Sequence, residues 1–396
     1  MCDKIGNEEK LLLLATIYKD NIVEKYLDQI EYKELSEEKL LKSLKADNYK
    51  IRSLLIYNLK KYDLFDKMPD MVKEFLNEEG KRAKEKFDQK IIEIKYIQKK
   101  ISDIRKPFLI LKGAGIAYTV YKEKPYIRDF NDIDILVEEK EADDIYKYFL
   151  ESMGYVCKKG LSEQLIYKNF FQHYAPICRE GVYVEMHHHL TQKQDPYYID
   201  TKRIMNNADI IHIDNMPVYI PNKEDMLISL CYHLFQHEYR EARFMLKPYP
   251  DIYNLLYSYK DNFEWNKLIE NVKKDKIEFP VIYSLYCVNH IYKELLDVDI
   301  VPKNVLDVLM PKDFYERKDA IVSRHLFNND EIIGVWSKTH IERLFMGTKE
   351  LRQELCRKYF FYTSEKHWKE ECNKLNIPFE ENFEFSPRIW EKYGRI

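Results

Sequence analysis

Glycine and proline are scarce in this chain and unevenly placed. Its 396 residues include 10 Gly and 14 Pro, about half of the roughly 12% that these two residues make up in average proteins. Because Gly and Pro form turns and interrupt helices, their scarcity predicts long helices with short connections and argues against an all-β sandwich or barrel. Five of the glycines lie between residues 113 and 181, and only Pro69 precedes residue 107. The chain therefore divides into a helical front, a turn-rich middle and a helical back.

The overall composition is that of a globular protein. Lys and Arg number 64 against 67 Asp and Glu, for a net charge of -3. We expect no bulk DNA binding, because no overall positive field would replace the counterions of the phosphates. No secretory signal and no apolar run of about 18 residues is visible, so we expect no membrane segment. The 7 cysteines are scattered without a C-x-x-C pair, which favours reduced thiols and a cytoplasmic location.

The patterning predicts three regions. Residues 1–106 are expected to be helical, with Ser36 as an N-cap and Pro69 at the start of a long helix that continues to about residue 105. Residues 107–220 contain short apolar and alternating runs, which predict a small mixed sheet with helices packed on it. Residues 221–396 return to helical periodicity and end in an extended tail. The expected fold class is α+β, mostly helical overall.

Within the middle and back regions, apolar periodicity and turn residues locate the individual elements. Gly154 is expected to close one helix and Gly181 to occupy a hairpin turn. Pro248 and Pro250 are expected to break the chain between two helices. The predicted strands are 108–111, 132–137, 155–157, 174–178 and 182–188, and the predicted helices are 139–153, 225–238, 251–259, 280–296 and 330–358.

Asp132 and Asp134 are the first candidates for chemistry. On a strand, residues two apart share a face, so both carboxylates project together while Ile133 and Ile135 point into the core. Like charges roughly 6–7 Å apart repel unless a cation lies between them, and carboxylate oxygens suit Mg²⁺ or Mn²⁺. Glu185 supplies a third acid on a neighbouring predicted strand. Three such carboxylates can hold two metal ions for phosphoryl or nucleotidyl transfer.

A small-residue turn precedes the acid pair. Lys112-Gly113-Ala114-Gly115 lies where a predicted strand passes into a helix. Small residues there let backbone N–H groups approach a phosphate, and the helix N-terminus adds its dipole.

The order of these motifs resembles the polymerase-β-type nucleotidyltransferase superfamily and, more narrowly, its group of uncharacterised nucleotidyltransferases. The resemblance rests on Leu-Lys-Gly ending at Gly113, on Arg128 four positions before the Asp132-Ile-Asp134 strand, and on Glu185-Met-His187. The resemblance covers about residues 107 to 260. Further along, Asp225, His233, His237 and Asp251 are similar to the helical half of the group.

The resemblance implies a role for each matching position. Asp132 and Asp134 would ligate metal, and Glu185 would be the third ligand or a base near the acceptor. Lys112 and Gly113, with Ala114 following, would meet the triphosphate. The superfamily usually has Gly-Ser or Gly-Gly at this turn, so Ala114 departs from its pattern by lacking the serine hydroxyl, whereas the narrower group carries Lys-Gly.

Two basic features have alternative readings. Arg128 is suited to a nucleotide phosphate or to pyrophosphate because its guanidinium is planar, but an ion pair with Asp129 or Asp132 would equally hold the loop. Lys247 would reach the triphosphate or lie on the surface. Residues 81–106 carry ten Lys or Arg against four Asp or Glu, either to meet an acidic or RNA substrate or as a solvated helix face.

The histidines also allow more than one interpretation. His187 shares the strand face of Glu185, where it would orient Glu185 or the nucleotide, while His187, His188 and His189 together raise the alternative of a zinc site. His233 and His237 lie four apart on one helix face. His233 is either a residue of the cleft near Asp225 or Asp251, or a core histidine.

We therefore expect a cytoplasmic nucleotidyltransferase that depends on Mg²⁺ or Mn²⁺. It would transfer a nucleoside monophosphate, AMP from ATP, to a hydroxyl or phosphate of an acceptor. A small molecule, a peptide, a protein and RNA all remain open as that acceptor. Two alternatives are a metal-dependent glycosyltransferase, whose D-x-D motif would hold a nucleotide-sugar, and a catalytically silent binding or antitoxin-like module.

Overall fold

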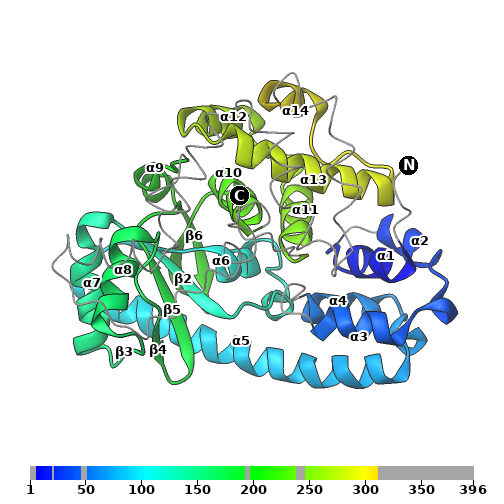
Figure 1. The fold of residues 1–396 in the computed structure, drawn as a ribbon, viewed down its shortest axis with the longest axis horizontal. Helices are drawn as coiled ribbons and strands as arrows, with labels where there is room; N and C mark the ends of the chain where they lie inside the picture. Colours follow the sequence, from blue (N-terminus) through cyan, green and yellow to red (C-terminus); the bar gives the residue numbers. More distant parts are fainter. Residues whose placement is uncertain (1–5, 20–21, 46–50, 192–196, 238–245, 311–396) are drawn as a thin grey trace, which may run out of the picture.

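The computed structural model describes residues 6–19, 22–45, 51–191, 197–237 and 246–310. The predicted helix at 330–358 and the predicted extended tail lie outside the described residues. In the described part the fold is mostly helical and surrounds one mixed sheet, as expected for the α+β class (Figure 1). None of the described helices combines the length and apolar character needed to cross a membrane.

The N-terminal region is a set of short helices and one long one. The elements are α1 (Asn7–Leu14), α2 (Ile22–Leu27), η1 (Tyr32–Glu34), α3 (Glu37–Lys45), α4 (Arg52–Lys61), η2 (Phe65–Lys67) and α5 (Asp70–Ile104). The predicted cap of α3 is confirmed, because the backbone N–H of Lys39 donates to Ser36 Oγ at 3.3 Å. Helix α5 begins directly after Pro69 and ends where Arg105 turns left-handed at φ 56°, which confirms both of its predicted bounds.

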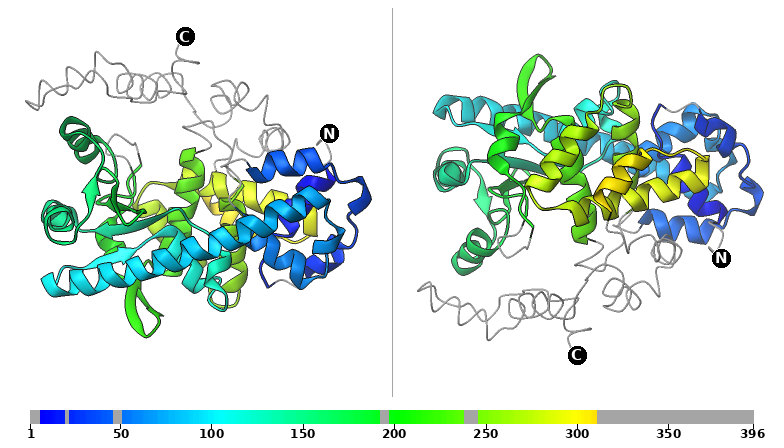
Figure 2. Two further views of the ribbon diagram at one scale, coloured as in Figure 1. Left: turned by 90° about the horizontal axis from the view of Figure 1, so that it is seen from below. Right: turned by 90° about the horizontal axis from the view of Figure 1, so that it is seen from above.

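Helix α5 joins the N-terminal helices to the sheet. It runs beneath both of them, along the lower edge of Figure 1, and fills the front of the left-hand view in Figure 2. Its apolar stripe includes Ile94, Ile97 and Ile101, all of them buried. Because these positions recur every three or four residues, one continuous face of the helix packs on the protein interior.

The five-stranded sheet has the order β1-β2-β5-β4-β3. Its strands are β1 (Phe108–Ile110), β2 (Asp132–Val137), β3 (Val156–Cys157), β4 (Ile177–Arg179) and β5 (Val182–His187). The central pair β2 and β5 is parallel, and the other three pairs are antiparallel. Ile133 and Ile135 on β2 are fully buried, as the alternation predicts.

Turn residues end these elements where the sequence places them. Glu180 and Gly181 both have positive φ, 49° and 83°, so they form the tight connection of the β4–β5 hairpin that suits the twist of its strands. Gly154, at φ 76°, follows α7 (Glu139–Ser152). Helices α6 (Lys112–Thr119), η3 (Pro125–Ile127) and α8 (Leu161–Phe170) complete this part of the chain.

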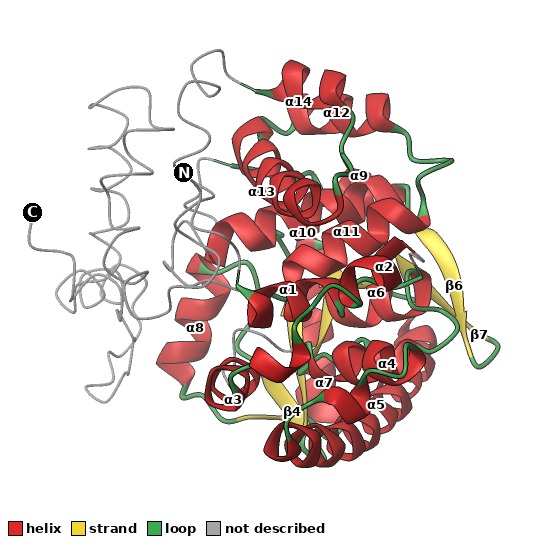
Figure 3. Ribbon diagram, turned by 90° about the vertical axis from the view of Figure 1, so that its right-hand side faces the viewer, coloured by secondary structure: helices red, strands yellow, loops and turns green. Residues whose placement is uncertain are grey.

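A second, two-stranded sheet was not among the predicted elements. Strands β6 (Asp209–Ile213) and β7 (Met216–Ile220) form an antiparallel hairpin that stands out from the body in Figure 3. Its turn is Asp214-Asn215, with φ values of 47° and 67°. Asp and Asn tolerate this left-handed conformation without glycine, so a search guided by glycine overlooks the turn.

The C-terminal region packs above the sheet. Helix α9 (Thr201–Asn206) precedes the β6–β7 hairpin, and the region after residue 220 contains α10 (Lys223–Phe235), α11 (Pro248–Ser258), α12 (Trp265–Lys274), α13 (Glu278–Leu296) and α14 (Lys303–Leu309). The prediction that Pro248 and Pro250 separate two helices is wrong, because both lie in the first turn of α11. Proline lacks an N–H, which a helix does not use in its first turn, so it fits there without loss of a hydrogen bond.

The front and back helical regions touch each other. The Tyr26 hydroxyl donates to the Leu296 carbonyl at 2.9 Å. Asn254 on α11 accepts from the backbone N–H of Tyr18 at 2.6 Å and donates to the Thr16 carbonyl at 3.0 Å. Residues more than two hundred positions apart therefore hold the front and back helical regions together.

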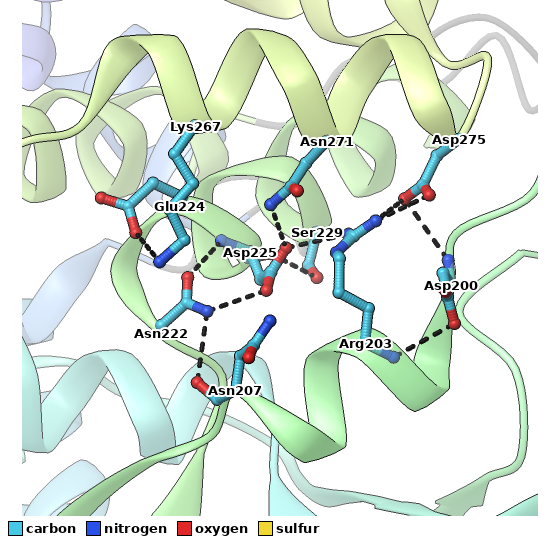
Figure 4. Close-up of polar contacts among 10 residues, drawn as sticks. All are labelled: Asp200, Arg203, Asn207, Asn222, Glu224, Asp225, Ser229, Lys267, Asn271 and Asp275. Carbon is cyan, nitrogen blue, oxygen red and sulfur yellow. Dashed lines mark hydrogen bonds and ion pairs between the residues drawn. The ribbon is translucent and has the colours of Figure 1, made fainter.

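A buried polar network holds α9, α10 and α12 together (Figure 4). Arg203 bonds Asp275 at 2.6 Å and Asp225 at 2.9 Å, and Asn271 donates to the same Asp225 carboxylate at 3.3 Å. Asn222 caps α10 by accepting the Asp225 backbone N–H at 3.0 Å. Asp225, a candidate neighbour of His233, is thus engaged by Arg203, Asn222 and Asn271.

We expect Arg203→Met to destabilise the protein by about 3–5 kcal/mol, the usual cost of removing one partner of a buried ion pair. Asp225 and Asp275, both buried, would then lie without their shared cation. Denaturant unfolding measures the effect, with the exposed Lys122→Met as the control. A change below 1 kcal/mol would mean that the network contributes little to holding these helices.

Candidate active site

The two predicted acidic strands lie side by side. In the parallel β2–β5 pair, Asp134 lies opposite Glu185, and Asp132 lies opposite Tyr183. Asp134 is buried, while Asp132 and Glu185 are partly buried. One ligand atom each of Asp134, Glu185 and His187 lies within 4.8 Å of the others. This donor set, buried and rich in carboxylate oxygen, fits a divalent cation.

A lysine occupies the centre of this acidic cluster. Lys112 Nζ lies 2.9 Å from Asp134 Oδ1. Burial alone would lower the pKa of Lys112, but the charges of Asp134 and Glu185 outweigh it, and the pKa is raised. Burial alone would likewise raise the pKa of Asp134, yet the Lys112 ammonium and the His187 imidazole hold it well below its ordinary range. Lys112 and Asp134 therefore form a charged, buried pair.

The crowding of acids raises the pKa values of the other two carboxyl groups. Burial and the negative charge of Asp134 raise the pKa of Asp132. Burial and the charges of Asp134 and Asp132 raise the pKa of Glu185 to about 8. Lys112 pairs with one acid of the three, and the raised pKa values of the other two mean that further positive charge would stabilise their ionised forms.

The backbone at the start of α6 is unusual. Lys112 opens the helix with φ at 42°, a left-handed conformation that costs a non-glycine residue energy and concentrates at functional sites. Gly113 and Ala114 follow it, both buried. A Cβ placed on Gly113 would come within 2.4 Å of Phe130 Cβ. The turn therefore presses against the loop that leads into Asp132.

We expect Gly113→Ala to shift that loop and to lower catalytic activity strongly, with a stability loss of about 1–3 kcal/mol from overpacking. Gly115→Ala is the matched control in the same helix. Its added Cβ would lie 3.4 Å from its nearest neighbour, the Ile110 carbonyl oxygen, which is ordinary contact. Thermal unfolding and initial rates of both variants check the prediction, and equal behaviour of the two would contradict it.

His187 is the histidine of the triplet that meets the acids. Its Nε2 lies 2.9 Å from Asp134 Oδ1 and 3.8 Å from Glu185 Oε2. Strand β5 ends at His187, so His188 and His189 lie beyond the strand. His189 instead pairs with Glu139 at 3.1 Å, and the His188 ring packs edge-on against Tyr174.

A cavity of about 20 Å³ adjoins the cluster. Its lining includes Lys112 and His187, together with Ser229, Tyr232 and His233 of α10. Burial, the ring of His237 and the charge of Lys112 lower the pKa of His233 well below its ordinary value. The structure thus places His233 at the same cavity as Lys112 and His187.

Arg128 makes its hydrogen bonds to residues outside the acidic cluster. Its guanidinium donates to both oxygens of Asp251 on α11, with Nε at 2.6 Å from Oδ1, and to the carbonyl of its neighbour Asp129. Arg128 therefore forms an ion pair, but its partner is Asp251, 123 positions away, and not the predicted carboxylate of Asp129 or Asp132. The predicted contact with a nucleotide phosphate stays a prediction.

Two further lysines hold the loop before Asp132. Lys247 Nζ donates to the Asp129 carbonyl at 2.6 Å, and Lys90 of α5 donates to the Phe130 carbonyl. Lys247 is also close enough to act on the charge of Asp132. Lys90 belongs to the basic segment 81–106, but it is buried and not part of a solvated face.

Comparison with known proteins gives a family. The model of a family described as uncharacterised nucleotidyltransferase matches residues 36–293, about two thirds of the chain. No curated protein matches.

One similar solved structure is the crystal structure of an antigenic nucleotidyltransferase-like protein from Paracoccidioides brasiliensis. It is 16% identical, with a TM-score of 0.32, and the match covers 53% of this chain and 93% of that one.

The matched residues 36–293 include the Lys112-Gly113 turn, the D-x-D strand and the strand of Glu185. The chain belongs to the family of uncharacterised nucleotidyltransferases.

Proposed function

We propose that this nucleotidyltransferase transfers AMP from ATP to a hydroxyl or phosphate of an acceptor, with a divalent cation held by Asp132, Asp134 and Glu185. The observation that carries the proposal is the β2–β5 register, which sets Asp134 opposite Glu185 beside the Lys112 turn. The bound Mg²⁺ or Mn²⁺ would supply charge neutralisation of the triphosphate and activation of the attacking oxygen.

The remaining roles belong to the side chains and backbone of the chain. Lys112 forms an ion pair with Asp134. When a cation binds Asp134 in its place, the Lys112 ammonium would bind a phosphate oxygen. The N–H groups that open α6 at Gly113 and Ala114 would support the same phosphates. In the proposed reaction the acceptor oxygen forms a bond to the α-phosphorus and pyrophosphate leaves.

Glu185 is the residue suited to take up the acceptor proton if it is not itself a ligand. Its pKa of about 8, raised by burial and by the two aspartates, is near that of an effective base at neutral pH. His233 and His187, which line the cavity beside the cluster, would contact the nucleotide or orient Glu185.

The acceptor pocket is proposed to involve the helical regions on both sides of the core at 107–220. Helix α10 contributes Ser229, Tyr232 and His233 to the cavity. A small molecule, a peptide, a protein side chain and RNA remain candidate acceptors. The cysteines Cys157, Cys178 and Cys231 are free thiols, which supports a cytoplasmic location.

The test is transfer of label from a nucleotide to a cellular acceptor. The full chain is incubated with each α-labelled triphosphate, or with labelled UDP-sugars, together with Mg²⁺ or Mn²⁺ and cell extract. We expect ATP to label one species whose mass rises by one AMP. Transfer from a UDP-sugar would overturn the proposal in favour of a glycosyltransferase. Failure to consume any triphosphate, with tight capture of a partner, would favour a silent binding module.

A further inference from the structure

A ring nitrogen of His187 lies close enough to carboxylate oxygens of Asp134 and Glu185 for the three to bind one metal ion. This donor set differs from the three carboxylates of the proposed function. The parallel pairing places His187 opposite Leu136, two positions past the Asp134–Glu185 pair and on the same strand face, and its Nε2 contacts Asp134. Asp134, Glu185 and His187 each offer one atom to a group within 4.8 Å. Asp132 lies two residues earlier on β2, opposite Tyr183. The closest set of donors is therefore two oxygens and one nitrogen.

The His187 ring is fixed in this orientation by its surroundings. Its side chain is 2% exposed. The backbone of His187 pairs with that of His173, and the two rings pack at 5.2 Å between centroids. His173 Nδ1 contacts the Tyr174 carbonyl at 2.8 Å, which holds that ring in turn. A ligand nitrogen held in place in this way loses little entropy on binding a metal.

The far side of the His187 ring has the features that metal-bound histidines use. A ligating imidazole donates its second N–H to an oxygen or to a water. Among the described residues, His187 Nδ1 and Gln172 Oε1 are both buried without a hydrogen-bond partner. Both residues line the same cavity of about 20 Å³, which has room for one water molecule. When Nε2 binds a cation, such a water would accept from Nδ1–H and donate to Gln172 Oε1.

We propose that His187 is a metal ligand and that Asp134, Glu185 and His187 form a mixed nitrogen and oxygen site that prefers Mn²⁺ to Mg²⁺. The inference rests on the proposed function in that it concerns the same site. Mg²⁺ selects oxygen donors, whereas imidazole suits first-row transition metals. A structural histidine that only orients Asp134 would leave the choice of metal unchanged.

The test is direct metal binding to the full, nucleotide-free chain. Mn²⁺ and Mg²⁺ affinities are measured by calorimetry for the wild type, His187→Gln and His189→Gln. Gln at 187 keeps a hydrogen-bonding group near Asp134 but removes the imidazole nitrogen. His189→Gln is the matched control, because His189 contacts Glu139 instead.

We expect the wild type to bind Mn²⁺ at least about tenfold more tightly than Mg²⁺, and His187→Gln to lose at least about tenfold in Mn²⁺ affinity. Its Mg²⁺ affinity should change less than threefold, and His189→Gln should match the wild type. Equal affinities for the two metals in the wild type, or an unchanged preference in His187→Gln, would overturn the proposal.

Pulsed electron paramagnetic resonance of Mn²⁺ on the wild type keeps the proposal testable even if His187→Gln does not fold. We expect the nitrogen coupling of a directly bound imidazole. Its absence in the Mn²⁺-loaded wild type would overturn the assignment. Because no nucleotide is present, Mn²⁺ binding through His187 in a protein that transfers no nucleotide would overturn the proposed function alone.

Discussion

Glu185→Gln is expected to make the protein more stable in the absence of metal and nearly inactive in its presence. In the folded protein the Glu185 carboxylate is partly buried beside Asp134 and Asp132, which raises its pKa to about 8. A neutral amide of the same shape removes the repulsion, so the free energy of unfolding should rise by about 1–3 kcal/mol at alkaline pH. Catalytic activity should fall by about 10³-fold or more, because a ligand or base has been lost.

The gain in stability should depend on pH with a defined sign. Between the ordinary pKa of a glutamate, 4.5, and about 8, the folded state holds a proton that the unfolded state has released. Stability attributable to this residue therefore falls as the pH rises through that window. The advantage of Glu185→Gln should be small near about pH 5 and largest above about pH 8.

Thermal or denaturant unfolding in the presence of a chelator measures this effect. Glu180→Gln is the control, because Glu180 lies on the same hairpin but is exposed. A Glu185→Gln protein that is less stable than the wild type at about pH 8.5 would show that the carboxylate is well accommodated without a cation.

Lys112→Met is expected to have the opposite effect on stability. The ammonium is the cation bound to Asp134 at 2.9 Å, and its loss would leave that buried carboxylate beside two further acids. Removing one partner of a buried pair costs about 3–5 kcal/mol. Activity should also fall, because the same lysine is proposed to meet the triphosphate.

Divalent metal should restore much of the stability of Lys112→Met. A cation binding to the folded state alone stabilises it by mass action, and in the variant it would replace the missing charge of Lys112. We therefore expect Mn²⁺ to raise the melting temperature of Lys112→Met more than that of the wild type, with exposed Lys122→Met as the control. An equal rise in all three proteins would mean that lysine and metal do not share one site.

Much of the architecture follows from local signals in the sequence. Pro69 and Ser36 mark helix starts, and the Glu180-Gly181 turn marks the β4–β5 hairpin, because each places a residue with restricted backbone or capping chemistry at an element boundary. The alternation around Asp132 and Asp134 likewise identifies β2. These features depend on neighbours within a few residues and are visible without a structure.

The charge partners of the site depend on distant residues and were less predictable. Arg128 finds Asp251 123 positions away, which no spacing rule indicates. Lys90 did carry a signal: it stands three residues after Phe87 and four before Ile94, within the buried stripe of α5. The many basic residues of segment 81–106 hide this signal, because the composition of the segment does not distinguish a buried lysine from an exposed one.

The left-handed start of α6 was equally hidden. The sequence identifies Lys112-Gly113 as a turn but not the φ of 42° that brings Lys112 onto Asp134. The contacts around this turn are tertiary: Gly113 lies against Phe130, and Lys112 pairs with Asp134. Tertiary contacts therefore decide the charge state of the site, whereas local patterning decides where its residues lie along the chain.

The most direct test of the central claim is nucleotide transfer by the double variant Asp132→Ala/Asp134→Ala. Label from α-labelled ATP is followed in the presence of Mg²⁺ or Mn²⁺ and the acceptor found with the wild type, and circular dichroism monitors folding. We predict a folded variant with no metal-dependent transfer above background. Transfer at the wild-type rate by the double variant would contradict the assignment of the β2–β5 acids as the catalytic centre.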